Sequence, residues 1–193
     1  MLAEGDRVPN LALTSDANKT VRLSDFEGKR LVVYFYPKDD TPGCTREGIA
    51  FSKLGADFAK AGAVVVGVSR DGVDKHCRFR DKYDLTVPLL ADTDRKLHDA
   101  FGAWGEKVMY GKKVEGAIRC TFLVGKDGRI ERVWKSVKVD GHAEQVLTAI
   151  RGEGAQGAPP AVKKPATEAA QTPPAKKPAA AKKPAAAKPV GKK

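Results

Sequence analysis

Two continuous hydrophobic runs stand out in the first half of the chain, and both are rich in β-branched or aromatic side chains. They are Leu31–Tyr36 and Ala63–Val68. Short runs of this kind, with almost no polar positions, are typical of central strands in a sheet covered on both faces. The pattern therefore predicts two buried strands.

The segment between these runs has the spacing of a helix. Apolar residues recur every two to four positions over Cys44–Ala61, which can place them along one side of a helix. Gly62 follows, and glycine commonly ends a helix. Strand, helix and strand in this order predict a β-α-β unit.

Further helices and strands alternate along the chain. The pattern predicts a helix, a short strand and a short helix over residues 71–84, 87–90 and 94–101, then a β-hairpin over 119–134 and a helix over 142–150. The hairpin turn is marked by Lys126-Asp127-Gly128. This order predicts an α/β sandwich with a central mixed sheet.

The composition changes sharply after Ile150. Eight of the twelve prolines lie beyond it, among repeated Lys-Lys-Pro-Ala units, and no Leu, Ile, Phe, Trp or Tyr occurs there. Such a segment cannot bury enough apolar surface to offset its ordering entropy. We therefore predict a folded domain, residues 1–152, and a disordered Lys/Ala/Pro-rich tail, residues 153–193.

The net charge of +11 is concentrated in this tail. Nine lysines and one glutamate follow from Gly154 onward, so that part carries +8 and residues 1–153 carry only +3. The tail resembles those of H1-type histones and bacterial nucleoid-associated proteins. Lysines without interleaved aromatics can neutralise phosphates but cannot stack on bases. Nonspecific nucleic-acid binding is one hypothesis for the tail, and a solubilising role is the other.

The sequence also bears on location and on cysteine chemistry. No basic start followed by an apolar run opens the chain, and no stretch approaches the ~18 apolar residues of a membrane span. We expect a cytoplasmic protein, associated with the nucleoid if the tail binds DNA.

The cysteines Cys44, Cys77 and Cys120 are too few for a disulfide framework and lack zinc-site spacing.

Cys44 lies where a turn-rich loop, starting at Tyr36, enters the predicted helix. The amides and dipole of a helix start stabilise an anion, and the thiolate is the nucleophilic form of cysteine. A free cysteine is nevertheless more often a small buried hydrophobe than a nucleophile. Position alone therefore leaves its role open.

The residues around Cys44 resemble those of peroxiredoxins. Pro37, Thr41 and Cys44 match the family's loop motif of Pro, three residues, Thr or Ser, two residues, Cys, and similarity to the bacterioferritin comigratory, or Q-type, branch extends over roughly residues 3–151. The resemblance implies a thioredoxin-like fold. It also implies a thiol peroxidase that reduces hydrogen peroxide and organic hydroperoxides to water and alcohols without metal or organic cofactor.

The resemblance also assigns roles to single residues. Cys44 would be the peroxidatic cysteine, which becomes a sulfenic acid, while Thr41 would hold the peroxide and Pro37 would shield the thiolate from water. Arg119 would be the active-site arginine, and a guanidinium can stabilise the charge that develops on the leaving oxygen. Glu47 could orient an arginine or be an ordinary solvated carboxylate, so we leave it out of the predicted site.

The chain departs from the Q-type pattern at the resolving cysteine. Ile49 and Arg80 occupy the two positions where members carry it. Cys77 lies three residues before Arg80 and about 200° around the helix from Phe79, so we expect it to point away from the core. Cys77 is thus a possible resolving cysteine, and direct reduction of Cys44 by an external thiol is the alternative.

The resemblance further implies that thioredoxin or another thiol reductant recycles the enzyme, which we expect to be monomeric or weakly associating. Cys120 follows Arg119 in a strand, so the two side chains point to opposite faces of the sheet, and we expect the side chain of Cys120 to be buried in the core without a catalytic role. The three histidines, at positions 76, 98 and 142, lack metal-ligand spacing, and we assign them no role.

Two other functions are conceivable. A DNA-binding or DNA-protecting protein could use an inert thioredoxin-like domain, but the intact set of Pro37, Thr41, Cys44 and Arg119 argues against inertness. A disulfide oxidoreductase would need a Cys-x-x-Cys motif. Thr41 takes the first position of that motif, which makes dithiol exchange within it impossible.

Overall fold

A seven-stranded mixed sheet forms the centre of the fold in the computed structural model, which describes residues 1–109 and 112–152. Its strand order is β2-β1-β5-β4-β3-β8-β9. The bounds are Ala12–Ser15 for β1, Thr20–Arg22 for β2, Arg30–Phe35 for β3, Ala63–Ser69 for β4, Leu89–Ala91 for β5, Cys120–Val124 for β8 and Ile130–Trp134 for β9. The predicted disordered tail, residues 153–193, lies outside the described residues.

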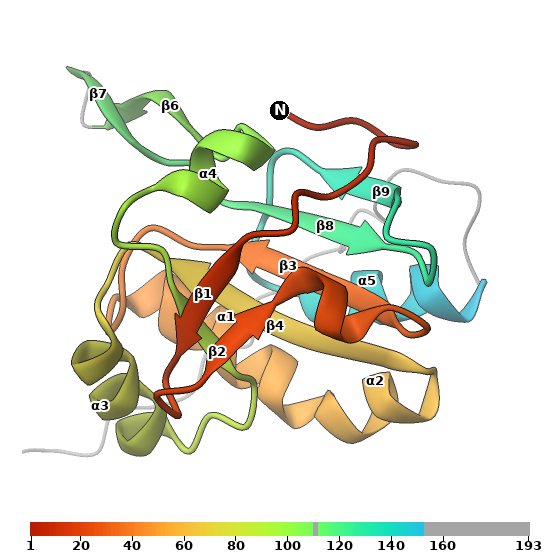
Figure 1. Cartoon of the computed structure of the whole chain (residues 1–193). Helices are drawn as coiled ribbons and strands as arrows, with labels where there is room; N and C mark the ends of the chain where they lie inside the picture. Colours follow the sequence, from red (N-terminus) through yellow and green to blue (C-terminus); the bar gives the residue numbers. More distant parts are fainter. Residues whose placement is uncertain (110–111, 153–193) are drawn as a thin grey trace, which may run out of the picture. The chain divides into compact units, whose positions relative to one another are not determined.

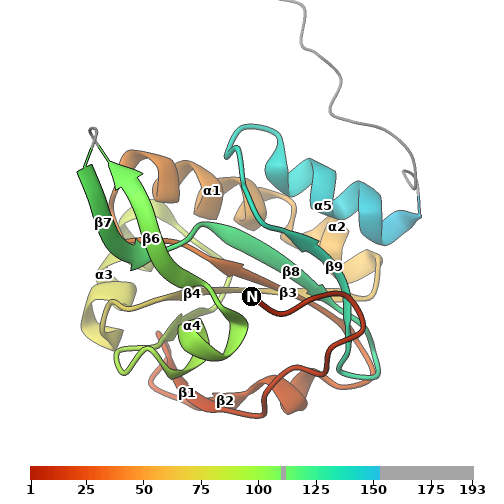
Figure 2. The same ribbon diagram turned by 90° about the horizontal axis from the view of Figure 1, so that it is seen from above.

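The strand directions make the sheet mixed. β3 pairs in parallel with β4, and β4 with β5, whereas β8 runs antiparallel to β3 and β1 antiparallel to β5. The helices are α1 (Pro42–Lys53), α2 (Gly55–Lys60), α3 (Val73–Tyr83), α4 (Lys96–Phe101) and α5 (His142–Arg151), with a 3-10 turn at Leu23–Phe26. α1 and α5 lie on one side of the sheet and α4 on the other (Figure 2). The predicted α/β sandwich is confirmed.

The side chains of β3 divide the core into two clusters. Val32 and Tyr34 point into the cluster that α1, α2, α3 and α5 cover, and Val33 and Phe35 point into the cluster beneath α4. All four side chains are at most 1% exposed. Burial of such a side chain stabilises the fold by ~1.5–3 kcal/mol, so the strand that leads into the Cys44 loop is firmly fixed.

The single helix predicted over Cys44–Ala61 is wrong in one respect, because the structure divides it at Leu54. Two features favour this break. Gly55 follows Leu54, and glycine in a helix is destabilising. The carbonyl of Ser52 also accepts a hydrogen bond of 3.3 Å from a residue outside the helix, through the hydroxyl of Thr86. Gly62, with φ of +72°, ends the segment as predicted.

Two hairpins were not predicted. β1 and β2 form an N-terminal hairpin at one edge of the sheet, and β6 (Trp104–Met109) pairs with β7 (Lys112–Ala117) in a separate two-stranded ribbon. This ribbon projects beside α4 (Figure 1). Among the helices in the described ranges, none is both long and apolar enough to cross a membrane.

Candidate active site

The loop after β3 delivers Cys44 into the first turn of α1. Tyr36 extends the strand pairing, since its N–H donates to the carbonyl of Val68 over 3.1 Å. Thr41 is the residue at the helix cap, with extended backbone, and Pro42 takes the first helical position, where its missing N–H costs nothing. Cys44 is the third residue of the helix, close to its free amide groups and positive dipole end.

Cys44 lies against a guanidinium. Its side chain is buried, and Nη2 of Arg119 donates a hydrogen bond to its Sγ over 3.1 Å. Arg119 immediately precedes β8, in which Cys120 pairs with Phe35 at the end of β3. The register of two neighbouring strands therefore brings Arg119 to the Cys44 loop.

Glu47 completes this group, although the sequence analysis left it out. Its carboxylate is 1% exposed and forms an ion pair with Nη1 of Arg119. Burial raises the pKa of Glu47 to about 7, against the opposing effect of Arg119. The only sequence signal was the spacing of three residues from Cys44, which puts both side chains on one helix face.

Thr41 and Pro37 are both half-buried and lie in the loop that leads into the first turn of α1. The hydroxyl of Thr41 donates to the carbonyl of Lys38 over 3.0 Å, so its lone pairs remain available to accept a further hydrogen bond. Gly43 lies between loop and cysteine, and a Cβ atom there would come within 3.4 Å of Arg119 Nη2. A side chain at this position would therefore be in van der Waals contact with the guanidinium.

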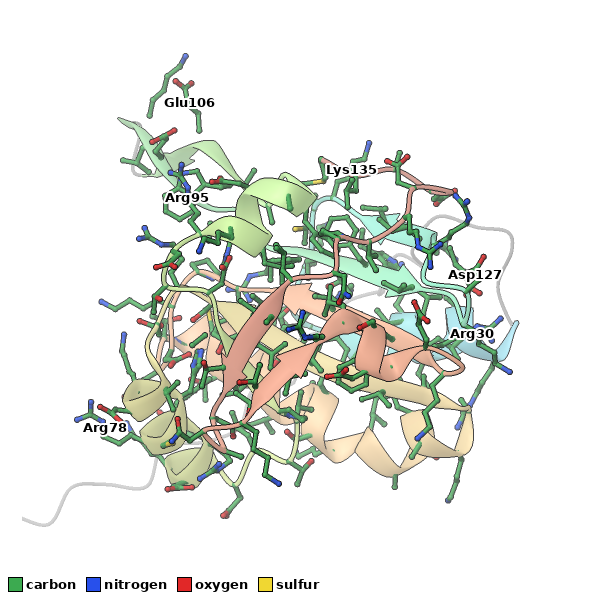
Figure 3. The ribbon with its side chains drawn as sticks, viewed as in Figure 1. Arg30, Arg78, Arg95, Glu106, Asp127 and Lys135 are labelled. Carbon is green, nitrogen blue, oxygen red and sulfur yellow. The ribbon has the colours of Figure 1, made fainter. Side chains whose placement is uncertain are left out.

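Cys77 is less open than the sequence analysis expected. Its side chain is half-buried, and its thiol donates to the backbone carbonyl of Asp16 over 2.8 Å. Asp16 belongs to the turn between β1 and β2, the unpredicted hairpin that covers this side of α3. The next residue, Arg78, points outward from α3 (Figure 3). Cys44 and Cys77 are both free thiols and face different partners.

Cys120 and the histidines contribute to the core. The Cys120 side chain is fully buried, and burial raises its pKa to about 12, so it remains a thiol. Each histidine is also buried, and each lies within 2.7–2.8 Å of a side-chain oxygen. No cluster of His, Cys, Asp or Glu in the described ranges could hold a metal ion. The arrangement instead suits a nucleophilic sulfur beside fixed hydrogen-bond donors.

Comparison with known proteins agrees with this chemistry. The AhpC/TSA family model matches residues 4–133. Peroxiredoxin Bcp of Bacillus subtilis is 44% identical over 147 residues, which span 76% of this chain and 94% of that relative. Peroxiredoxin Bcp of Xanthomonas campestris is 46% identical over 146 residues, which span 76% and 90%.

Two solved structures from Xanthomonas campestris share the fold. Peroxiredoxin Q superposes with a TM-score of 0.70 at 46% identity, covering 74% of this chain and 90% of its own. The bacterioferritin comigratory protein, described in a study of its alkyl peroxide reduction, superposes with a TM-score of 0.71 at 42% identity, covering 76% and 98%. The chain therefore belongs to the AhpC/TSA family and is a thiol-dependent peroxidase of the Bcp, or Q-type, branch of the peroxiredoxins.

Proposed function

We propose that Cys44 is the peroxidatic sulfur and that its substrates are hydrogen peroxide and organic hydroperoxides, including alkyl hydroperoxides. The observation that carries this assignment is the hydrogen bond from Arg119 to Cys44 Sγ at the start of α1. A guanidinium and a helix N-terminus together stabilise negative charge on sulfur, which is the form that attacks. The similarity to the Xanthomonas campestris protein supports the alkyl substrates.

The thiolate attacks the terminal oxygen of the hydroperoxide, ROOH. A sulfur–oxygen bond forms as the oxygen–oxygen bond breaks, and the leaving RO⁻ takes a proton to become an alcohol or water. Cys44 is thereby oxidised to a sulfenic acid. Arg119 stabilises charge on both the sulfur and the leaving oxygen, Thr41 accepts a hydrogen bond from the peroxide, and Pro37 excludes water.

Glu47 acts through Arg119 in this scheme. Its buried ion pair holds one amino group of the guanidinium and leaves the other directed at Cys44. A fixed guanidinium loses little entropy when the transition state forms, which is where its hydrogen bonds count most.

We propose that Cys77 resolves the sulfenic acid. Its thiol would attack the sulfur of Cys44, form a disulfide and release water, and a thioredoxin dithiol would return both cysteines to thiols. Each thiol must first leave its present partner, which is Arg119 for Cys44 and the carbonyl of Asp16 for Cys77. A disulfide also needs the two Cα atoms to come within about 7 Å of each other. The step therefore requires local rearrangement of α1 or α3.

A coupled turnover assay tests these assignments. Thioredoxin, thioredoxin reductase and NADPH would supply electrons, with hydrogen peroxide or cumene hydroperoxide as oxidant. Cys44→Ser should abolish turnover, Cys77→Ser should greatly reduce it, and Cys120→Ser should leave it unchanged. Full turnover by Cys77→Ser would show that an external thiol resolves Cys44 directly.

We further propose that the lysine-rich tail binds polyanions such as DNA and that the chain acts as a monomer in the cytoplasm, partly at the nucleoid. The charge distribution supports this role, since residues from 154 onward carry +8 and the rest only +3. Such binding would neutralise phosphates without reading sequence.

A further inference from the structure

The loop that carries Pro37 and Thr41 is bonded to both ends of α3. At the beginning of α3, the N–H of Asp39 donates to Oδ2 of Asp71 over 2.6 Å. At its end, Asp40 accepts hydrogen bonds from Lys82 over 2.9 Å and from Tyr83 over 2.5 Å. The helix that carries Cys77 is thus fastened to the loop beside Cys44.

The strongest of these connections is buried. Oδ2 of Asp39 lies 2.7 Å from Nδ1 of His76, and both side chains are 0% exposed. The hydroxyl of Tyr36 donates to the other carboxylate oxygen over 2.8 Å. Because a carboxylate can only accept, the imidazole proton on this side belongs to Nδ1. The second ring nitrogen, Nε2, has no hydrogen-bond partner among the described residues.

This pair fixes the loop more firmly than the exposed contacts do. Breaking a buried hydrogen-bonded pair leaves a polar group without solvent or partner, which is costly. The side chains of Asp40 and Lys82 are 45% and 57% exposed, and ion pairs of that kind contribute little. Asp39 and His76 therefore form a fully buried attachment between loop and helix, beside the part-buried hydrogen bond from the N–H of Asp39 to Asp71.

We propose that the Asp39–His76 pair is a latch that holds the Cys44 loop in its peroxide-reactive conformation and opens before Cys77 can reach Cys44. This inference rests on the proposed roles of the two cysteines. His76 is the immediate neighbour of Cys77, so displacement of Cys77 from its place on α3 also displaces His76. The closed latch favours the reaction with peroxide, and the open latch favours disulfide formation.

A loosened latch should change two rates in opposite directions. Reaction of Cys44 with peroxide slows, because Thr41 and Pro37 are no longer held in place. Disulfide formation accelerates, so fewer sulfenic acids meet a second hydroperoxide and become sulfinic acid, with release of a second alcohol or water. Asp39 and His76 are positioning residues in this scheme, since they act through the loop.

The chain contains a matched control pair. Oδ2 of Asp92 lies 2.7 Å from Nδ1 of His98, with side chains 1% and 0% exposed, and Nε2 of His98 also lacks a partner in the described part of the chain. His98 packs against Phe35, in the cluster beneath α4, and Asp92 follows β5. The control pair has the same chemistry and burial but does not hold the Cys44 loop.

The test compares Asp39→Asn and His76→Gln with Asp92→Asn and His98→Gln in the full chain. Stopped-flow oxidation by hydrogen peroxide gives the rate constant of Cys44, and intact mass after repeated turnover gives the sulfinic fraction. Thermal unfolding midpoints identify variants of equal stability. The isosteric Asp39→Asn variant carries the test if His76→Gln does not fold.

We expect the latch variants to react with peroxide ~10- to 100-fold more slowly, the effect of misplacing a positioning group, and to form several-fold less sulfinic acid. The control variants should stay within about twofold of wild type in both measurements. The latch would be refuted if the latch and control variants changed the oxidation rate and the sulfinic fraction equally, or if Asp39→Asn behaved like wild type. Either result would leave the proposed peroxidase function standing. A wild type whose Cys44 stays reduced would overturn the proposed function itself.

Discussion

Nη2 of Arg119 donates a hydrogen bond to Sγ of Cys44 over 3.1 Å, although 75 residues separate them in the sequence. The antiparallel register of β3 and β8 creates this contact, since Cys120 pairs with Phe35 and Arg119 comes just before. The other amino group of Arg119 pairs with Glu47 on α1. One guanidinium thus links the nucleophile, its helix and the start of β8 in the sheet.

Replacement of Arg119 tests the electrostatic part of this account. Arg119→Met should lower the rate constant of Cys44 oxidation by hydrogen peroxide ~10²- to 10³-fold, the usual effect of removing one preorganised donor. Stopped-flow kinetics measures it. The control is Arg46→Met on the helix that carries Cys44, because Arg46 is 63% exposed and pairs with the exposed Asp140. A rate for Arg119→Met within threefold of wild type would contradict the assignment.

Replacement of Thr41 tests the placement of the peroxide. Thr41→Val keeps the size of the side chain but removes the hydroxyl, and we expect ~10- to 100-fold slower oxidation of Cys44 with little change in stability. Thr45→Val is the matched control one turn later. The Thr45 hydroxyl is buried without a partner in the described residues, so its loss should leave the rate unchanged. Equal rates for the two variants would remove Thr41 from the mechanism.

The buried carboxyl of Glu47 should make stability depend on pH. Burial raises its pKa from 4.5 to about 7, so the folded chain binds this proton more tightly than the unfolded chain does. The resulting stabilisation is complete below about pH 4.5 and is lost as the pH rises through about 7. The stability of wild type relative to Glu47→Gln should therefore fall by up to about 3 kcal/mol between pH 5 and pH 8.

Urea unfolding of both proteins at several pH values measures this difference, and titrations of all other groups cancel in the comparison. A difference that stays constant with pH would show that Glu47 is charged throughout this range.

Removal of the tail separates peroxide chemistry from polyanion binding. A chain ending at Gly152 should oxidise Cys44 at the wild-type rate, whereas only the full chain should bind duplex DNA. Fluorescence anisotropy should show affinity of the full chain falling steeply with salt, since each phosphate contact contributes a slope of about −0.9. Salt-insensitive binding, or equal binding by the truncated chain, would refute the proposed role of the tail.

Local patterns were sufficient for much of the fold. β3 and β4 follow from their hydrophobic runs, and β8 and β9 from the turn signal between them. The hairpin of β1 and β2 was missed because its strands have only four and three residues, too few to show an alternating pattern. That omission explains why Cys77 was expected to be open, since the turn of this hairpin covers it.

The residues of the site also fall into those that a local pattern predicts and those that only distant contacts bring together. Pro37, Thr41 and Cys44 lie within one loop, so a motif can capture them. Glu47 and Asp39 owe their burial to partners 72 and 37 residues away. A carboxylate on a helix or in a loop has the same sequence signal whether it faces water or a buried partner. Only the tertiary structure distinguishes the two cases.

The central claim is that Cys44 is the sulfur oxidised by peroxide. The most direct test is intact-mass spectrometry with thiol alkylation after one equivalent of hydrogen peroxide, applied to wild type, Cys44→Ser and Cys77→Ser. We predict that wild type loses two hydrogens and two alkylatable thiols, that Cys77→Ser accumulates oxidised Cys44, and that Cys44→Ser remains fully reduced. A wild type in which Cys44 stays reduced while the peroxide persists would contradict the account.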